Sequence, residues 1–174
     1  SEQTGQRNAA SSAAVVQPPL GGNIGLEIYL KRGYFYVVNQ AATAARFSAV
    51  QIFNPAGSGV DLYIPNINGF NSAGTVVWRV MGNDVANGGA PTASSVAPMR
   101  RDTTKVAAAA IYGFSLAANT ANTEYGRISI AATTPAGAGI LLGNEGFVLP
   151  PGKGVQIEQE TVNTGMTLEF PIFE

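Results

Sequence analysis

Histidine and cysteine are both absent from the 174 residues of this chain. Without histidine, the chain by itself has no imidazole general base, no histidine-based catalytic triad and no histidine metal ligand. Without cysteine, thiol catalysis, disulfides and cysteine-bound zinc are excluded. Because these absences remove much hydrolytic and metal chemistry, we expect a protein that is not an enzyme and that uses neither a metal ion nor a cofactor.

Charged residues are also scarce. Asp, Glu, Lys and Arg make up 12% of the chain, about half of the roughly 25% that is usual in soluble domains. The net charge of -1 gives no attraction to nucleic acid, and no apolar run reaches the roughly 20 residues of a membrane helix. A surface so poor in charge is typical of one that other protein covers. We therefore expect a subunit of an assembly, with no nucleic-acid or membrane partner.

Composition divides the chain into two parts. Residues 1–19 are mostly small and polar, lack a clear strand pattern and end in two prolines. They predict an extended N-terminal arm, and the apolar pair Val15 and Val16 is its candidate anchor on a neighbouring subunit. The alternative is a disordered terminus. Residues 20–174 are long enough for a single domain with its own core.

From residue 20 onwards, apolar and polar residues alternate, which is typical of strands that bury one face. Trp78 follows the apolar positions of its strand, so we expect it in the core. Turn residues predict hairpin loops at 54–59 and 150–154, and 82–104 reads as a long loop. The fold class is therefore all-β: an antiparallel β-sandwich, specifically a jelly roll, with an extended N-terminal arm. The predicted strands lie at 26–30, 34–38, 47–53, 60–64, 76–80, within 106–116, and at 127–130, 146–149, 155–160 and 166–172.

Three glutamates are the remaining candidates for catalysis. Glu158 and Glu160 stand two apart in a predicted strand and so share a face, and Glu169 lies in the following strand. Paired carboxylates are the groups that a glycosidase uses, and they are also ligands that bind calcium. Glutamates on the outer face of a strand are ordinarily exposed to solvent, and this is the interpretation that we prefer.

Basic and aromatic residues are candidates for contact with a partner. Arg100, Arg101 and Lys105 form the one local basic cluster, which predicts contact with an acidic patch. The alternative is a solvated loop. Tyr34 and Tyr36 share one face of a predicted strand, so this face belongs to the core, to an interface or to a platform for sugar.

Two segments carry a resemblance to a known group of proteins. Residues 50–60 read VQIFNPAGSGV, a Gly-, Ala- and Thr-rich middle follows, and residues 146–155 read GFVLPPGKGV. In these features the chain from about residue 46 to residue 173 resembles small β-sandwich virion proteins of tailed bacteriophages, among them capsid decoration (cement) proteins. The resemblance implies a jelly roll without catalytic residues.

The function that the resemblance implies is structural. Decoration proteins of this kind sit on the capsid surface, often as trimers, and use extended arms to bridge neighbouring capsid subunits. We therefore expect a virion protein that stabilises the capsid, with the major capsid protein and its own copies as partners. The alternative is the receptor-binding tip of a tail fibre or spike, which would recognise glycan through Tyr34, Tyr36, Tyr63 and the asparagine-rich loop around Phe70.

Overall fold

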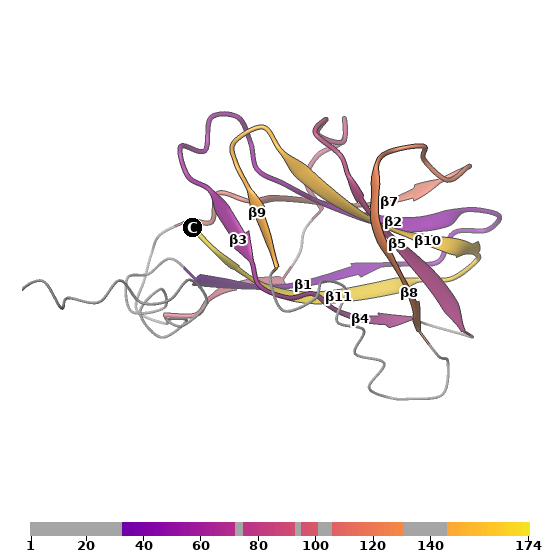
Figure 1. The fold of residues 1–174 in the computed structure, drawn as a ribbon. Coiled ribbons are helices and arrows are strands. Elements are labelled where there is room, and N and C mark those ends of the chain that lie inside the picture. Colours follow the sequence, from indigo (N-terminus) through magenta and orange to yellow (C-terminus); the bar gives the residue numbers. More distant parts are fainter. Residues whose placement is uncertain (1–32, 72–74, 93–94, 101–105, 131–145) are drawn as a thin grey trace, which may run out of the picture.

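The computed structural model describes residues 33–71, 75–92, 95–100, 106–130 and 146–174. Within these ranges there are eleven β-strands and no helix, arranged as two antiparallel sheets that pack together (Figure 1). The predicted antiparallel β-sandwich is confirmed. The predicted arm and the predicted strand at 26–30 lie outside the described residues.

The two sheets differ in size, and we name them sheet A and sheet B. Sheet A has the strand order β6-β1-β11-β3-β9, and β4 also pairs with β11. Its strands are β1 (Gly33–Gln40), β3 (Leu62–Ile64), β4 (Asn68–Asn71), β6 (Ser95–Pro98), β9 (Phe147–Leu149) and β11 (Met166–Phe173). Sheet B has the order β7-β2-β10-β5-β8. Its strands are β2 (Phe47–Phe53), β5 (Val76–Gly82), β7 (Ala110–Leu116), β8 (Glu124–Ile130) and β10 (Gly154–Val162).

Strand pairing in the two sheets is nested. β1 pairs with β11 and β3 with β9 in sheet A, whereas β2 pairs with β10 and β5 with β8 in sheet B. The chain therefore runs as one long hairpin whose successive pairs fall alternately in the two sheets. This arrangement brings the first and last described strands together at the centre of sheet A (Figure 1).

The core lies between the sheets and follows the predicted alternation. In β11, every second residue from Met166 to Ile172 is buried, and Phe170 stacks on Tyr36 with ring centroids 5.5 Å apart. Trp78 is also fully buried, as predicted. Its ring packs against Gly69 of β4 so closely that a Cβ at this glycine would lie 1.7 Å from the ring.

Both predicted hairpin loops are instead crossings between the sheets. Residues 54–59 lead from β2 in sheet B to β3 in sheet A, and residues 150–154 lead from β9 in sheet A to β10 in sheet B. The hairpin prediction was wrong because turn residues indicate a change of direction, not the sheet that the next strand joins.

Asn54 joins these two crossings. Its side-chain Nδ2 donates to the carbonyl of Val60 at 2.8 Å and to that of Leu149 at 2.7 Å. Its backbone nitrogen donates to the carbonyl of Lys153, and its own carbonyl accepts from Gly152, both at 2.8 Å. The side chain and the backbone of this one buried residue therefore satisfy backbone groups from both crossings and hold the crossings together.

The sequence pattern missed two short strands. β6 lies inside the predicted loop 82–104 and pairs with β1, and β4 lies in the predicted asparagine-rich loop and pairs with β11. Each has four residues with little alternation. Backbone pairing with a longer strand, not side-chain pattern, places them in sheet A.

Gly69→Ala tests the packing of β4 on Trp78. We expect a loss of about 3 kcal/mol in the free energy of unfolding, because overpacking a closed core costs roughly 1–3 kcal/mol and occasionally more. Urea denaturation provides the measurement. The matched control is Gly126→Ala, also in a strand, where a Cβ meets nothing within 4 Å. Equal effects of the two substitutions would contradict the close packing.

Candidate functional site

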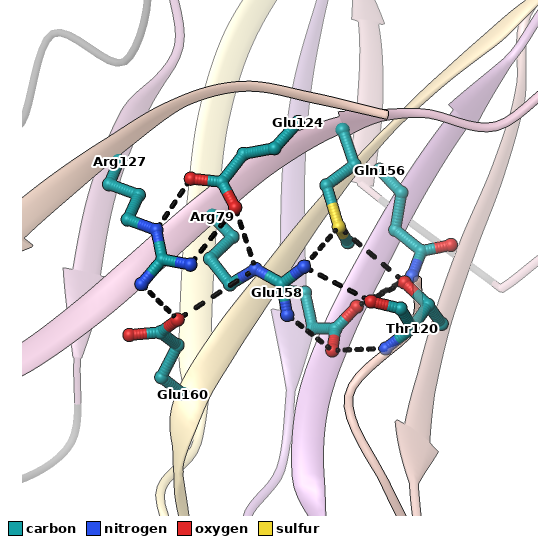
Figure 2. A network of polar contacts seen from close by, with 8 residues as sticks. Arg79, Thr120, Glu124, Arg127, Gln156, Glu158 and Glu160 are labelled. Atoms are coloured by element: carbon teal, nitrogen blue, oxygen red, sulfur yellow. Dashed lines mark hydrogen bonds and ion pairs between the residues drawn. The ribbon is translucent and has the colours of Figure 1, made fainter. Parts of the chain in front are cut away.

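A network of charged and polar side chains lies on the outer face of sheet B, the face turned away from the core (Figure 2). Strand β10 contributes alternate residues to it, as predicted from their spacing. The network consists of Arg79 and Met81 from β5, Thr120 from the segment before β8, Glu124 and Arg127 from β8, and Gln156, Glu158 and Glu160 from β10.

Glu158 is the centre of this network and is 0% exposed. Its carboxylate accepts hydrogen bonds from the backbone nitrogen of Thr120 at 3.0 Å, from the Thr120 hydroxyl at 2.8 Å and from Gln156 Nε2 at 3.1 Å. The expectation that this glutamate faces solvent is wrong. Alternation identified the outer face correctly, but it does not show that another part of the chain covers that face.

Arg79 connects the buried carboxylate with two more exposed ones. Its Nε donates to Glu124 at 3.2 Å and lies 3.8 Å from Glu160, and its Nη1 lies 4.0 Å from Glu158. A further bond runs from Nη2 to the carbonyl of Thr120 at 3.0 Å. The guanidinium therefore compensates the buried negative charge and also fastens the covering segment to the sheet.

Arg127 completes the network at its exposed end. It pairs with Glu124 through Nε and with Glu160 through Nη1, the latter at 2.7 Å. Hydrogen bonding to Arg127 lowers the pKa of Glu124, and the same contact raises the pKa of Arg127. Glu124 therefore stays ionised near neutral pH, whereas a general acid needs a raised pKa. Glu169, the third candidate for glycosidase chemistry, lies on β11 in sheet A and does not join the group.

A second chain segment covers the β2 side of this face. Gln51 is fully buried there; its Nε2 donates to the carbonyls of Asn83 and Val85 at 3.2 and 2.8 Å, and its Oε1 accepts from the backbone nitrogen of Asn87 at 2.9 Å. The Asn83 side chain also donates to Gln156 at 2.7 Å. Much of the outer face of sheet B is thus closed by the chain itself.

The outer face of sheet A has a different character. Phe35 of β1 is 36% exposed and lies opposite Pro171 of β11, and Tyr63 packs on Phe173 with ring centroids 6.4 Å apart. Among the described strand residues of this face, Glu169 is the one charged side chain. We call this surface the apolar face of sheet A.

A cleft of about 240 Å³ lies beside the crossing from β9 to β10. Lys153 and Asp84 form an ion pair at 2.7 Å in its wall, and Tyr125 packs against Phe147 with ring centroids 5.6 Å apart. Hydrogen bonding to Lys153 lowers the pKa of Asp84, and the same bond raises the pKa of Lys153. Both groups therefore remain charged over a wide range of pH. We call this feature the Tyr125 cleft.

The structure places the predicted partner-contact tyrosines in the core. Tyr34 and Tyr36 are buried beside Val38, and burial raises the pKa of both hydroxyls. Of the three faces that the sequence left open to this pair, the structure assigns the core, which corrects their assignment as partner contacts. Alternation then turns Phe35 outward, so this residue is the exposed aromatic side chain of the strand.

The other predicted contact residues are only partly described. Arg100 follows β6 and is half-buried. Val15, Val16, Arg101 and Lys105 lie outside the described residues. The expected contact of the basic cluster with an acidic patch of a partner therefore stays a prediction.

Sequence reasoning missed the residues that the structure brings together from other strands. Arg79 had a signal: it stands between Trp78 and Val80, a charged residue inside an otherwise apolar strand. Such a side chain needs a partner when it is buried. Thr120 and Tyr125 had no comparable signal, because their positions depend on how the chain folds over sheet B.

A scan against protein-family models and a search of curated proteins each found no match to this chain. Within the described ranges, no group of acidic side chains is placed to hold a metal ion. The same part of the chain contains no helix long and apolar enough to cross a membrane.

Glu158→Ala tests the buried end of the network. We expect the free energy of unfolding to fall by about 3–5 kcal/mol, because removal of one partner leaves buried donors and a charge uncompensated. Glu160→Ala is the matched control on the same face of β10. It removes a carboxylate whose side chain is 25% exposed, and exposed pairs contribute about 0.2–1 kcal/mol. Denaturant unfolding measures the free energy of unfolding of both variants. Similar losses in the two would contradict the role of Glu158 as the buried centre of the network.

Asp84 gives a prediction for pH. Its folded-state pKa is depressed, so its contribution to stability is present above the unfolded pKa and is lost as pH falls through the folded pKa. Carboxyl NMR titration should find the Asp84 midpoint below the ordinary value of about 3.9. In Lys153→Met the midpoint should rise, since the main cause of the depression is gone. An unchanged midpoint in this variant would contradict the ion pair.

Proposed function

We propose that this chain is a non-enzymatic virion structural protein that decorates a phage capsid and bridges neighbouring capsid subunits. The observation that carries the proposal is the contrast between the two outer faces of the sandwich. Chain segments cover much of the sheet B face, whereas the apolar face of sheet A has a single charged side chain among its described strand residues. A surface of this kind is suited to burial against another protein.

The strand order supports the proposal. Nested pairs that alternate between two sheets are what a jelly roll of two Greek keys requires, and jelly rolls occur in viral capsid proteins and in lectins. In this chain the pairs are β1–β11, β2–β10, β3–β9 and β5–β8. We therefore propose a jelly roll in which β4, β6 and β7 are additional strands that pair with β11, β1 and β2.

The proposed location is the outer surface of the capsid, with the major capsid protein as partner. A specific interface buries roughly 800 Å² on each partner, and apolar area contributes about 25 cal/mol per Å² before the costs of association. Trimer formation by the chain and an arm that reaches a neighbouring subunit belong to the same proposal. In this arrangement Phe35 lies in the contact with the capsid.

The alternative is a glycan-recognising tip of a tail fibre or spike. Two of the aromatic residues that motivated it, Tyr34 and Tyr36, are in the core. One observation still favours sugar recognition, namely the Tyr125 cleft, which combines aromatic rings with charged groups.

Phe35→Asp tests the role of the apolar face. Light scattering first gives the mass of the full chain, which we expect to be that of a trimer. Cosedimentation with phage capsid shells stripped of decoration protein then gives the affinity, which should fall at least tenfold in the variant because a carboxylate is placed in an apolar contact.

The matched control is Val85→Asp, which introduces the same charge at an exposed apolar residue outside sheet A. It should bind the shells as the unaltered chain does. A monomeric chain without affinity for shells would overturn the proposal. If Phe35→Asp binds the shells as tightly as the unaltered chain, the apolar face of sheet A is not the capsid contact.

A further inference from the structure

The Tyr125 cleft owes its exposed ring to an irregularity in sheet B. In the pairing of β5 with β8, Val80 lies opposite Gly126, and Met81 lies opposite Glu124, so Tyr125 has no residue opposite it. Such a bulge redirects a side chain and often occurs beside functional sites. Tyr125 is 60% exposed, an unusual position for a large aromatic side chain in a strand.

The Tyr125 ring is nevertheless held in place. Its hydroxyl lies over Gly82, where a Cβ would approach to 2.7 Å, so glycine leaves the space that the phenol occupies. On another side the ring packs against Phe147, with an angle of 48° between the ring planes. A ring that is fixed and still exposed loses little conformational entropy when a ligand stacks on it.

Charged groups lie in the same cleft at fixed positions. The Asp84 carboxylate accepts a hydrogen bond from the Lys153 ammonium at 2.7 Å. Both side chains of the pair are still about half exposed, at 55% and 54%. Each therefore keeps hydrogen-bonding capacity toward the cleft: the carboxylate accepts and the ammonium donates.

The crossing itself positions Lys153. The carbonyl of this residue accepts the backbone hydrogen bond from Asn54, and its nitrogen donates to the carbonyl of Pro150 at 3.1 Å. The wall of the cleft is therefore part of the tight crossing from β9 to β10 and not a free loop. A site on a rigid element keeps its geometry without a ligand.

We propose that the Tyr125 cleft binds one neutral sugar ring. The apolar C–H face of the sugar stacks on the Tyr125 ring, while neighbouring hydroxyls donate to Asp84 and accept from Lys153. The volume of about 240 Å³ is below the roughly 300 Å³ at which pockets for drug-sized ligands begin, which favours a single ring. The charges of Asp84 and Lys153 cancel, so the cleft offers no net attraction to an acidic sugar.

This inference does not rest on the proposed capsid role, since the cleft and the apolar face of sheet A use different residues. It adds a ligand site to the protein whether the chain decorates a head or forms the tip of a fibre.

The test is an NMR titration of the full ¹⁵N-labelled chain. The neutral probes are the methyl glycosides of glucose, galactose, mannose and N-acetylglucosamine, and the acidic probes are those of glucuronic and sialic acid. We expect at least one neutral glycoside to shift the amide signals of Gly82, Tyr125 and Lys153 with a millimolar dissociation constant. Acidic glycosides should bind more weakly.

Variants decide whether the cleft is responsible. Tyr125→Ala should weaken the binding at least tenfold, and the near-isosteric Asp84→Asn should weaken it at least threefold. Phe35→Ala, which removes an exposed aromatic ring on the other sheet, should leave it unchanged. Absence of binding by every neutral probe, preference for the acidic probes, or full binding by a folded Tyr125→Ala variant would overturn the proposal. Loss of shell binding by Phe35→Asp reports on the capsid role alone, so the two proposals fail separately.

Discussion

The buried carboxylate of Glu158 imposes the constraint on which the arrangement of sheet B depends. An ionised group without access to water is stable only with a compensating charge and hydrogen-bond donors. Arg79 supplies the charge, and Thr120 and Gln156 supply the donors. β5 must therefore lie beside β10 with Arg79 opposite Glu158, and the segment before β8 must close over the sheet. Much of the outer face of sheet B is consequently covered by the chain itself.

Asn54 has a similar role where the chain passes between the sheets. By bonding to both crossings it fixes the end of the sandwich at which the Tyr125 cleft lies. Two buried polar side chains thus determine local arrangement. Glu158 determines which strand lies beside β10, and Asn54 holds the two crossings together. Among the described residues, the two surfaces that we propose for partners are the apolar face of sheet A and the cleft. Their chemistry differs, since one is broad and poor in charge, and the other is small and contains an ion pair.

Period-two alternation was enough to predict most of the strands and the class of fold. It placed Trp78 and the apolar residues of β11 correctly, because the alternation of side chains between the two faces is a local property of a strand. It failed for β4 and β6, where pairing with a neighbour replaces pattern. The candidate sites were harder to predict. The spacing of Tyr34 and Tyr36 places both side chains on one face of their strand but does not show whether this face is the core or the surface. The stacking of Tyr36 on Phe170 and the burial of both tyrosines in the core cluster decide it.

The sequence by itself determined which residues alternate, that histidine and cysteine chemistry is absent from the chain, and how few charged residues it has. The tertiary structure decided which sheet each strand joins, and therefore that 54–59 and 150–154 are crossings. It also decided that Glu158 is buried and that Tyr125 is exposed, against their ordinary tendencies. The physical reason is that both outcomes depend on contacts between distant segments: Thr120 closes over β10, and a bulge against β5 turns Tyr125 outward. Residue type and local spacing do not indicate such contacts, because the contacting residues are far apart in the sequence.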